Sequence, residues 1–280
     1  MPYPPGRLTQ SKPRTLPRQD QPRNKFVVSG LGMAVILVLT VSSPPLLAYP
    51  LTRLEPLRNG APGMLQPHTG SLLVDYYEAF LRDQDVDAFR RSVTARYGEA
   101  TLTRLLHSGD LRARRASVLA LGLFGGFESN AAVAHALKDT DPTIRNLADN
   151  ALWAIWYRAH TPENNKALER IHDQIGRGQF LEAVRSADAL IAEAPGFAEA
   201  YNQRAIANFR RGRFAESIAD CRAVVERNPF HTGALSGMGQ CLLRVGQIEE
   251  ALTTFRTALE IQPYNESLRQ VVAELEAEGR

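Results

Sequence analysis

The sequence predicts an all-α fold, a solenoid of stacked helix pairs, and two observations lead to it. From Ser71 onward, apolar residues return every three or four positions, and no segment shows the strict alternation of a β-strand. The same part of the chain repeats itself at two fixed spacings, of 31 and 34 residues. A chain of 280 residues, of which 44% are hydrophobic, can bury the continuous core that such stacking requires.

The first 70 residues are predicted to target the protein to a membrane or for export, and to lie outside the repeats. Residues 1–25 form a basic, polar arm, so the excess charge lies outside the folded body and gives no reason to expect nucleic-acid binding. Residues 26–49 are uncharged and mostly apolar, with a break at Ser42-Ser43-Pro44-Pro45, which favours a cleaved signal or an uncleaved membrane anchor. An anchor would hold the C-terminal body outside the cytoplasm, whereas cleavage would give a secreted or periplasmic protein. Residues 50–70, rich in proline and glycine, form an expected linker.

Residues 71–160 contain the shorter repeat. The segment from Asp110 to Gly125 aligns with that from Asp141 to Trp156, each after a short predicted helix at residues 100–107 or 131–137. Each aspartate is expected to cap its helix, and the arginine one turn later, Arg114 or Arg145, to pair with an aspartate of a neighbouring repeat. Helices within residues 71–97 would then cap the N-terminal end of this short array.

This pattern resembles the HEAT-like repeats of the phycobilin-lyase type. The resemblance rests on Asp110, Arg114 and the sequence Ala120-Leu121-Gly122; the second copy has lost the glycine. It implies paired helices that present a binding surface. It also raises an alternative function, a bilin lyase-like or chaperone-like factor, although such repeats serve far more often as binding surfaces.

The longer repeat is carried by glycine and proline. Gly178, Gly212 and Gly246 lie 34 residues apart, as do Pro195, Pro229 and Pro263. Glycine permits a tight turn between two antiparallel helices, and proline ends the second helix. Residues 164–265 therefore contain three helix-turn-helix repeats, at 164–197, 198–231 and 232–265, and residues 266–280 form a solubilising helix at the end of the array.

These three repeats resemble the tetratricopeptide (TPR) family. The resemblance implies that the first helix of each repeat lines a concave groove that binds an extended peptide or a helix of a partner protein. Leu168, His172, Gly233 and Gly237 stand where cytosolic chaperone adaptors carry a cationic clamp, so no clamp is expected. The candidate groove residues are Asn165, Leu168, His172, Ile175, Glu199, Asn202, Gln203, Ile206, Arg210, Ser236, Gln240, Leu243 and Arg244.

No motif in the sequence indicates catalysis. The histidines are scattered, and the spacings typical of zinc sites, phosphate loops and nucleophile elbows are missing, so we expect no metal, cofactor or small-molecule substrate. Trp153, Trp156 and Tyr157 either line a pocket or, as we favour, seal the junction between the two arrays. Cys221 and Cys241 are expected to be separate buried thiols. If the folded body is exported, an oxidising compartment would allow them to form a disulfide.

The leading interpretation is a non-catalytic scaffold for other proteins, presented at the membrane or in a bacterial cell envelope. The alternatives are the lyase-like or chaperone-like factor and a cytosolic TPR adaptor.

Overall fold

The structure, a computed structural model, describes residues 71–278, in which all regular structure is helical, as predicted. The predicted arm, apolar segment and linker at residues 1–70 lie outside the described part. Among the described helices, none combines the length and the apolar character needed to cross a membrane.

The N-terminal part of the described chain contains six α-helices: α1 (Leu72–Asp83), α2 (Val86–Thr94), α3 (Glu99–Ser108), α4 (Leu111–Phe124), α5 (Asn130–His135) and α6 (Pro142–Tyr157). Short 3₁₀ turns at Phe127–Ser129 and Ala136–Lys138 flank α5. The pairs α3–α4 and α5–α6 are the two predicted repeats, and α1 and α2 pack against α4 at one end of them, as expected of a cap. We call residues 71–160 the N-terminal body.

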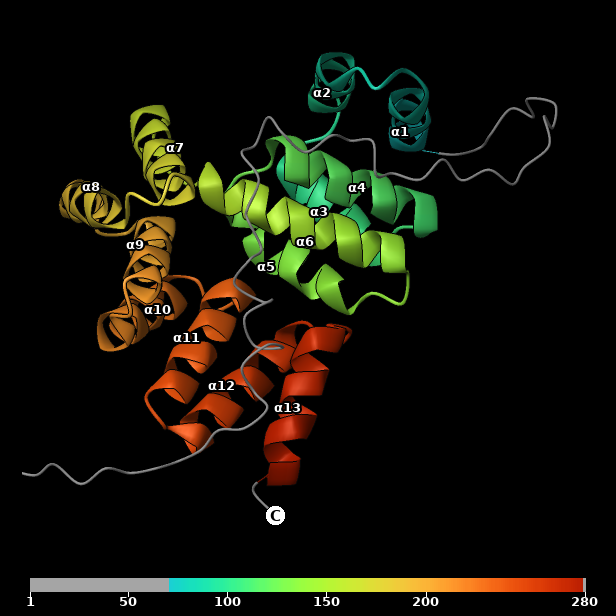
Figure 1. Cartoon of the computed structure of the whole chain (residues 1–280). Coiled ribbons are helices and arrows are strands. Elements are labelled where there is room, and N and C mark those ends of the chain that lie inside the picture. The colour runs from blue at the N-terminus through green and yellow to red at the C-terminus, as the bar shows by residue number, and fades with distance from the viewer. Residues whose placement is uncertain (1–70, 279–280) are drawn as a thin grey trace, which may run out of the picture.

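The C-terminal part consists of three helix pairs and a last helix: α7 (Pro162–Gly176), α8 (Phe180–Glu193), α9 (Ala198–Arg210), α10 (Phe214–Arg227), α11 (Thr232–Arg244), α12 (Ile248–Ile261) and α13 (Glu266–Glu278). Each pair packs against the next, and α13 packs against α12. We call α7–α13 the array. Figure 1 shows the array as an arc that runs around one side of the N-terminal body, from α7 at one end to α13 at the other.

The predicted helix starts and turns are confirmed in detail. Asp110 Oδ1 accepts a hydrogen bond from Ala113 N at 2.9 Å, and Asp141 Oδ1 accepts one from Ile144 N at 3.0 Å, so both aspartates cap their helices. The three glycines at the 34-residue spacing have φ angles of +75°, +71° and +81°. Only glycine adopts this left-handed conformation without a steric penalty, which explains its place in each turn.

The predicted arginine–aspartate pair forms in one repeat only. Arg114 Nε donates to Asp139 Oδ2 at 3.0 Å across the two repeats. Arg145, at the equivalent position, instead donates to the backbone carbonyls of Asp139 and Thr140, so its predicted pairing with an aspartate was wrong. The reason is topological: the array follows α6, and it places the Tyr264 ring against the Arg145 guanidinium, 4.0 Å from the ring centre.

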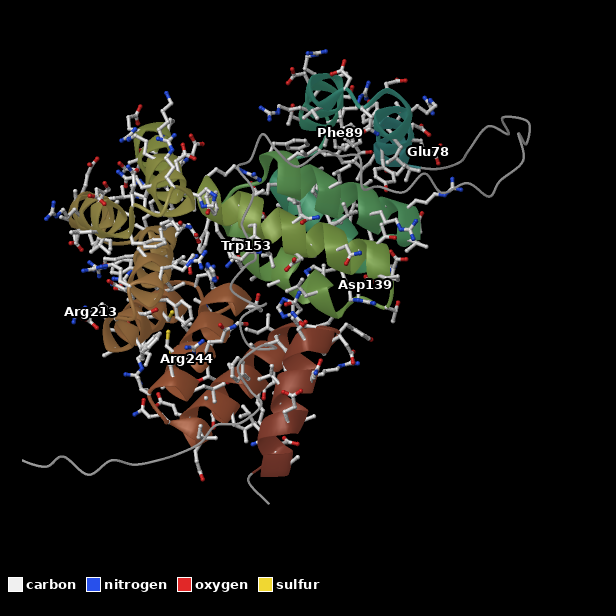
Figure 2. All side chains as sticks on the ribbon, in the orientation of Figure 1. Glu78, Phe89, Asp139, Trp153, Arg213 and Arg244 are labelled. Carbon is white, nitrogen blue, oxygen red and sulfur yellow. The ribbon has the colours of Figure 1, made fainter. Side chains whose placement is uncertain are left out.

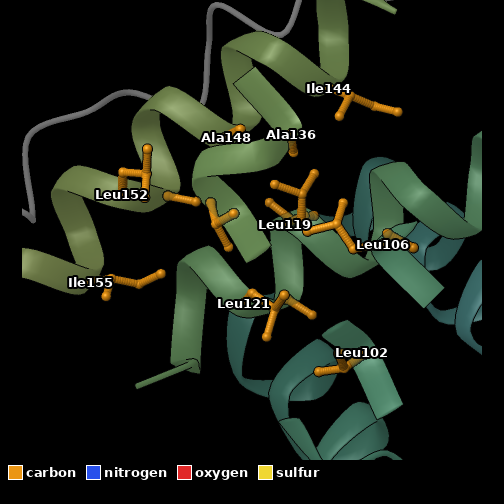
Figure 3. Close-up of a cluster of buried hydrophobic side chains, with 14 of the residues drawn as sticks. Leu102, Leu106, Leu119, Leu121, Ala136, Ile144, Ala148, Leu152 and Ile155 are labelled. Atoms are coloured by element: carbon orange, nitrogen blue, oxygen red, sulfur yellow. The ribbon is translucent and has the colours of Figure 1, made fainter. Parts of the chain in front are cut away.

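Each part has its own apolar core. In the N-terminal body, leucine, isoleucine and alanine side chains from α3, α4, α5 and α6 pack together, including Leu121 and Ile155, each fully buried (Figure 3). In the array, the Phe255 ring lies so close to Gly239 that an added Cβ would stand 2.6 Å from its Cζ atom. Small residues at such positions let the paired helices approach closely.

Candidate partner-binding groove

The predicted groove residues all lie on α7, α9 and α11, the first helices of the three pairs, but the structure divides them by exposure. The buried ones are Leu168, Glu199, Asn202, Gln203, Ser236 and Gln240. The partly or fully exposed ones are Asn165, His172, Ile175, Ile206, Arg210, Leu243 and Arg244. In this conformation only the second set is accessible to another protein.

The N-terminal body covers much of the array through one face of α6. That face carries a side chain every four residues, at Arg145, Asp149, Trp153 and Tyr157. At its start, the Arg145 guanidinium lies 4.0 Å from the centre of the Tyr264 ring, and Asp149 Oδ1 accepts from Gln262 Nε2 at 3.3 Å. Tyr264 and Gln262 belong to the turn between α12 and α13, so this end of α6 meets the last repeat.

Trp153 and Trp156 contact the next repeat boundary, at His231. The Trp156 ring stacks on the His231 ring with centroids 4.1 Å apart, and the Trp153 ring meets it edge-on at 5.3 Å. A Cβ on Gly233, in the first turn of α11, would stand 2.9 Å from Trp153, so glycine leaves room for the indole. Figure 2 shows Trp153 on the side of α6 that faces the array.

A buried carboxylate stands beside these rings. Glu199 Oε1 accepts from Asn202 Nδ2 at 2.7 Å and from Gln203 Nε2 at 2.9 Å. Its Oε2 lies 3.0 Å from His231 Nε2. Because His231 Nδ1 accepts the backbone N–H of Ala234 at 3.0 Å, the imidazole proton must reside on Nε2, which donates to Glu199. The three donors to this carboxylate are therefore neutral.

The end of α6 reaches the first two repeats through Tyr157. Its hydroxyl group accepts from Gln203 Nε2 at 2.8 Å and lies 3.1 Å from His172 Nδ1. Tyr157 is buried, so these bonds hold α6 against α9 and α7. The aromatic cluster thus seals the junction between the two parts, as predicted, and one of its members, Trp156, also lines a small cavity there.

Two asparagines extend this junction, and sequence reasoning missed both. Trp156 Nε1 donates to Asn130 Oδ1 at 2.7 Å, and Asn130 Nδ2 donates to Asn228 Oδ1 at 2.9 Å. All three side chains are buried. The repeat spacing gives no signal for either: the positions 34 residues before and after Asn228 hold Ala194 and Gln262, and Asn130 lies outside the array.

The uncovered residues form a second, accessible region at the other end of α9 and α11. Arg210 and Arg244 are equivalent positions of adjacent repeats and are both exposed, whereas Ile206 and Leu243 are half-buried beside them. Neither arginine forms an ion pair within residues 71–278. We call these four residues the open patch; Figure 2 labels Arg244 within it.

A cavity of about 110 Å³ opens at the junction, between the end of α6 and the loops that precede α9 and α11. Its lining includes Phe127, Trp156, Phe197, Glu199, Arg227 and His231. A second cavity, of about 90 Å³, lies between α6 and the α12–α13 turn and includes Asp149 and Gln262. Burial raises the pKa of the Asp149 carboxyl above its ordinary value.

The two cysteines lie in the apolar core, where their surroundings indicate a structural role. Cys221 and Cys241 are free, buried thiols, and Cys241 Sγ donates to Ser217 Oγ at 3.3 Å. Burial raises the pKa of the Cys221 thiol, which keeps it protonated. Nowhere in residues 71–278 do three histidine, cysteine or acidic side chains gather as they would around a metal ion.

Comparison with known proteins supports the assignment of the array. The model of the family described as the N-terminal TPR repeats region of Psidin matches residues 165–272. Among solved structures, the chain is similar to the TPR2AB domain of yeast Sti1 in its pHSP90 complex, with 18% identity over 73% of this chain and 90% of that chain. The TM-score of that match is 0.39. A search of curated proteins gave no match.

The HEAT-like character of the N-terminal body stays a prediction, since the family match begins after it. For the array, the family match agrees with the 34-residue spacing and with the left-handed glycine that ends the first helix of each pair. Residues 165–272 are therefore a TPR repeat region, and this chain is a TPR repeat protein.

Proposed function

We propose that this protein is a non-catalytic scaffold that binds another protein through the open patch of its TPR array. The observation that carries the proposal is that the groove helices α7, α9 and α11 are partly covered by α6 and partly exposed. Where α6 covers them, Glu199 and the Gln203 Nε2 group are hydrogen-bonded within the chain; at the far ends of α9 and α11, two arginines without an ion pair in the described chain and two half-buried apolar side chains remain. Exposed, unpaired arginines beside apolar surface are typical of protein-binding sites.

The chemistry of the open patch suggests the kind of segment that it binds. Arg210 and Arg244 hold equivalent positions on the first helices of adjacent repeats and offer two guanidinium groups to carboxylates; that of Arg210 lies 5.9 Å from the centre of the Phe180 ring. Ile206 and Leu243 offer apolar contact area next to them. A short segment that alternates acidic and apolar side chains would satisfy both.

The test uses charge reversal with a matched control. A photo-crosslinking amino acid at Leu243 captures the partner in cells, and the same amino acid at Leu181, exposed on the outer face of α8, controls for proximity. With the purified partner, the double variant Arg210→Glu and Arg244→Glu should weaken binding at least tenfold. Arg185→Glu, on exposed α8 surface, should leave it unchanged. Equal binding by all three proteins would contradict the proposal.

We also propose that residues 26–49 present the scaffold at the membrane or in the cell envelope. The support is the apolar composition of that segment and the basic arm before it. Fractionation of a C-terminally tagged chain, with protease accessibility and the mature N-terminal sequence, tests this part separately. A soluble, uncleaved chain protected inside the cell would refute it.

A further inference from the structure

The larger cavity belongs to neither part of the molecule alone. Phe127 and Trp156 come from the N-terminal body, Phe197 and Glu199 from the start of α9, and His231 from the start of α11. The cavity therefore exists only because α6 is seated on the array. At about 110 Å³ it is far smaller than the several hundred Å³ of a typical small-molecule site, so it has room for a single side chain.

Glu199, one of the residues that line the cavity, is a buried carboxylate with no cation in direct contact among residues 71–278. Glu199 is 1% exposed, and its carboxylate accepts hydrogen bonds only from Asn202, Gln203 and the neutral His231. Burial of a carboxylate among neutral donors is costly, and a positive charge placed nearby lowers that cost.

Arg227 also lines the cavity, but its N–H groups are directed elsewhere. They donate to the carbonyls of Pro195 and Ala223 and to the hydroxyl group of Tyr201, at 2.8 to 3.1 Å. None of these three acceptors lines the cavity. The guanidinium also lies 4.2 Å from the centre of the Tyr201 ring, which holds it in place.

The other walls are aromatic. Trp156 and Phe197 are buried in the lining, and Phe127 stands at the rim with 41% of its surface exposed. Aromatic faces attract ammonium groups through the ring quadrupole, and the attraction grows as the cation loses water. Aromatic walls combined with one buried carboxylate select a slender cation over a neutral side chain of the same length.

We propose that this cavity is a binding site for an alkylammonium group, such as the side chain of a lysine presented by a partner protein. The alkyl chain would lie against Phe127, and the ammonium group would approach Glu199 and Trp156. That the lysine belongs to a protein rests on the proposed function. The chemistry of the cavity itself does not.

The test uses small probes on the full chain. N-acetyl-lysine amide and N-acetyl-norleucine amide have side chains of similar length but differ in charge, and ligand-observed NMR with tryptophan fluorescence reports their binding. The lysine probe should bind at least tenfold more tightly than the norleucine probe. Equal affinities, or no saturable binding of the lysine probe, would overturn the proposal.

Two variants test the assigned walls. Phe127→Ala removes a ring at the rim that is 41% exposed and should weaken lysine binding at least threefold with only a small drop in the melting temperature, whereas Leu181→Ala, at 44% exposure, should leave lysine binding unchanged. Glu199→Gln should abolish the preference for lysine over norleucine. If Glu199→Gln fails to fold, Phe127→Ala still decides, because unchanged lysine affinity in that variant contradicts the site. Neither result depends on the open patch, so this proposal and the proposed function fail independently.

Discussion

Replacement of Trp156 by phenylalanine measures how much the buried hydrogen bonds at the junction stabilise the fold. Phenylalanine keeps a ring beside His231 but removes the N–H that Asn130 Oδ1 accepts at 2.7 Å. Trp156 is 3% exposed and Asn130 is 5% exposed, so water cannot replace the lost donor. An unpaired buried acceptor costs about 1–3 kcal/mol. The smaller ring adds roughly 1 kcal/mol of lost packing.

We therefore expect Trp156→Phe to lower the free energy of unfolding by about 2–4 kcal/mol. Urea unfolding followed by circular dichroism measures the change. Trp153→Phe is the matched control, because it loses the same ring atoms while its indole N–H has no acceptor within the described chain. That variant should lose only about 1 kcal/mol.

A double-mutant cycle with Asn130→Ala isolates the hydrogen bond. If the bond acts as described, the two substitutions should be coupled by about 1 kcal/mol or more. Equal losses in the two tryptophan variants, or additive losses in the cycle, would refute the reasoning and reduce the junction to apolar packing alone.

Three further predictions concern backbone, charge and thiols. Gly246→Ala, at φ +81°, should cost about 1–2 kcal/mol, whereas Gly176→Ala, with open space around it, should be neutral or stabilising; thermal melts compare them. Burial raises the pKa of Asp149 above its ordinary 3.8, so the folded state holds that proton more tightly and stability falls as pH rises from about 3.8 through the folded-state pKa. The Asp149→Asn variant should lack this loss of stability with rising pH and should be more stable than the natural protein at pH 7. Urea unfolding at several pH values from about 3.8 to 7 measures both effects, and a pH profile equal to that of the natural protein would contradict the prediction. The buried Cys221 thiol should react with a disulfide reagent far more slowly in native than in unfolded protein, and equal rates would place it at the surface.

The repeat spacing predicted most of the fold because its signals are local. A glycine that must adopt positive φ and a proline that ends a helix act within a few residues, so the pattern around Gly212 and Pro229 located the turns and helix ends correctly. The aspartate caps at Asp110 and Asp141 were predictable for the same reason.

The placement of one part on the other could not be predicted in the same way. Glu199 and Gln203 are polar residues on a helix face, which usually indicates contact with solvent or a ligand. Here Gln203 donates to Tyr157, which lies 46 residues away and becomes a neighbour only when α6 packs on the array, and Glu199 accepts from His231, 32 residues away in the next repeat. No spacing within either repeat carries that information.

The contact between α6 and every repeat boundary fixes the shape of the array. A TPR array with free faces bends and twists because each repeat contacts only its neighbours. Here a helix of 16 residues, roughly 24 Å long, touches the first repeat through Tyr157 and the turn after the third through Arg145. The number of repeats is thereby matched to the length of one helix. An inserted or deleted repeat would move His231 or Tyr264 out of register with α6, so in proteins built on this plan the repeat number and the length of α6 should change together or not at all.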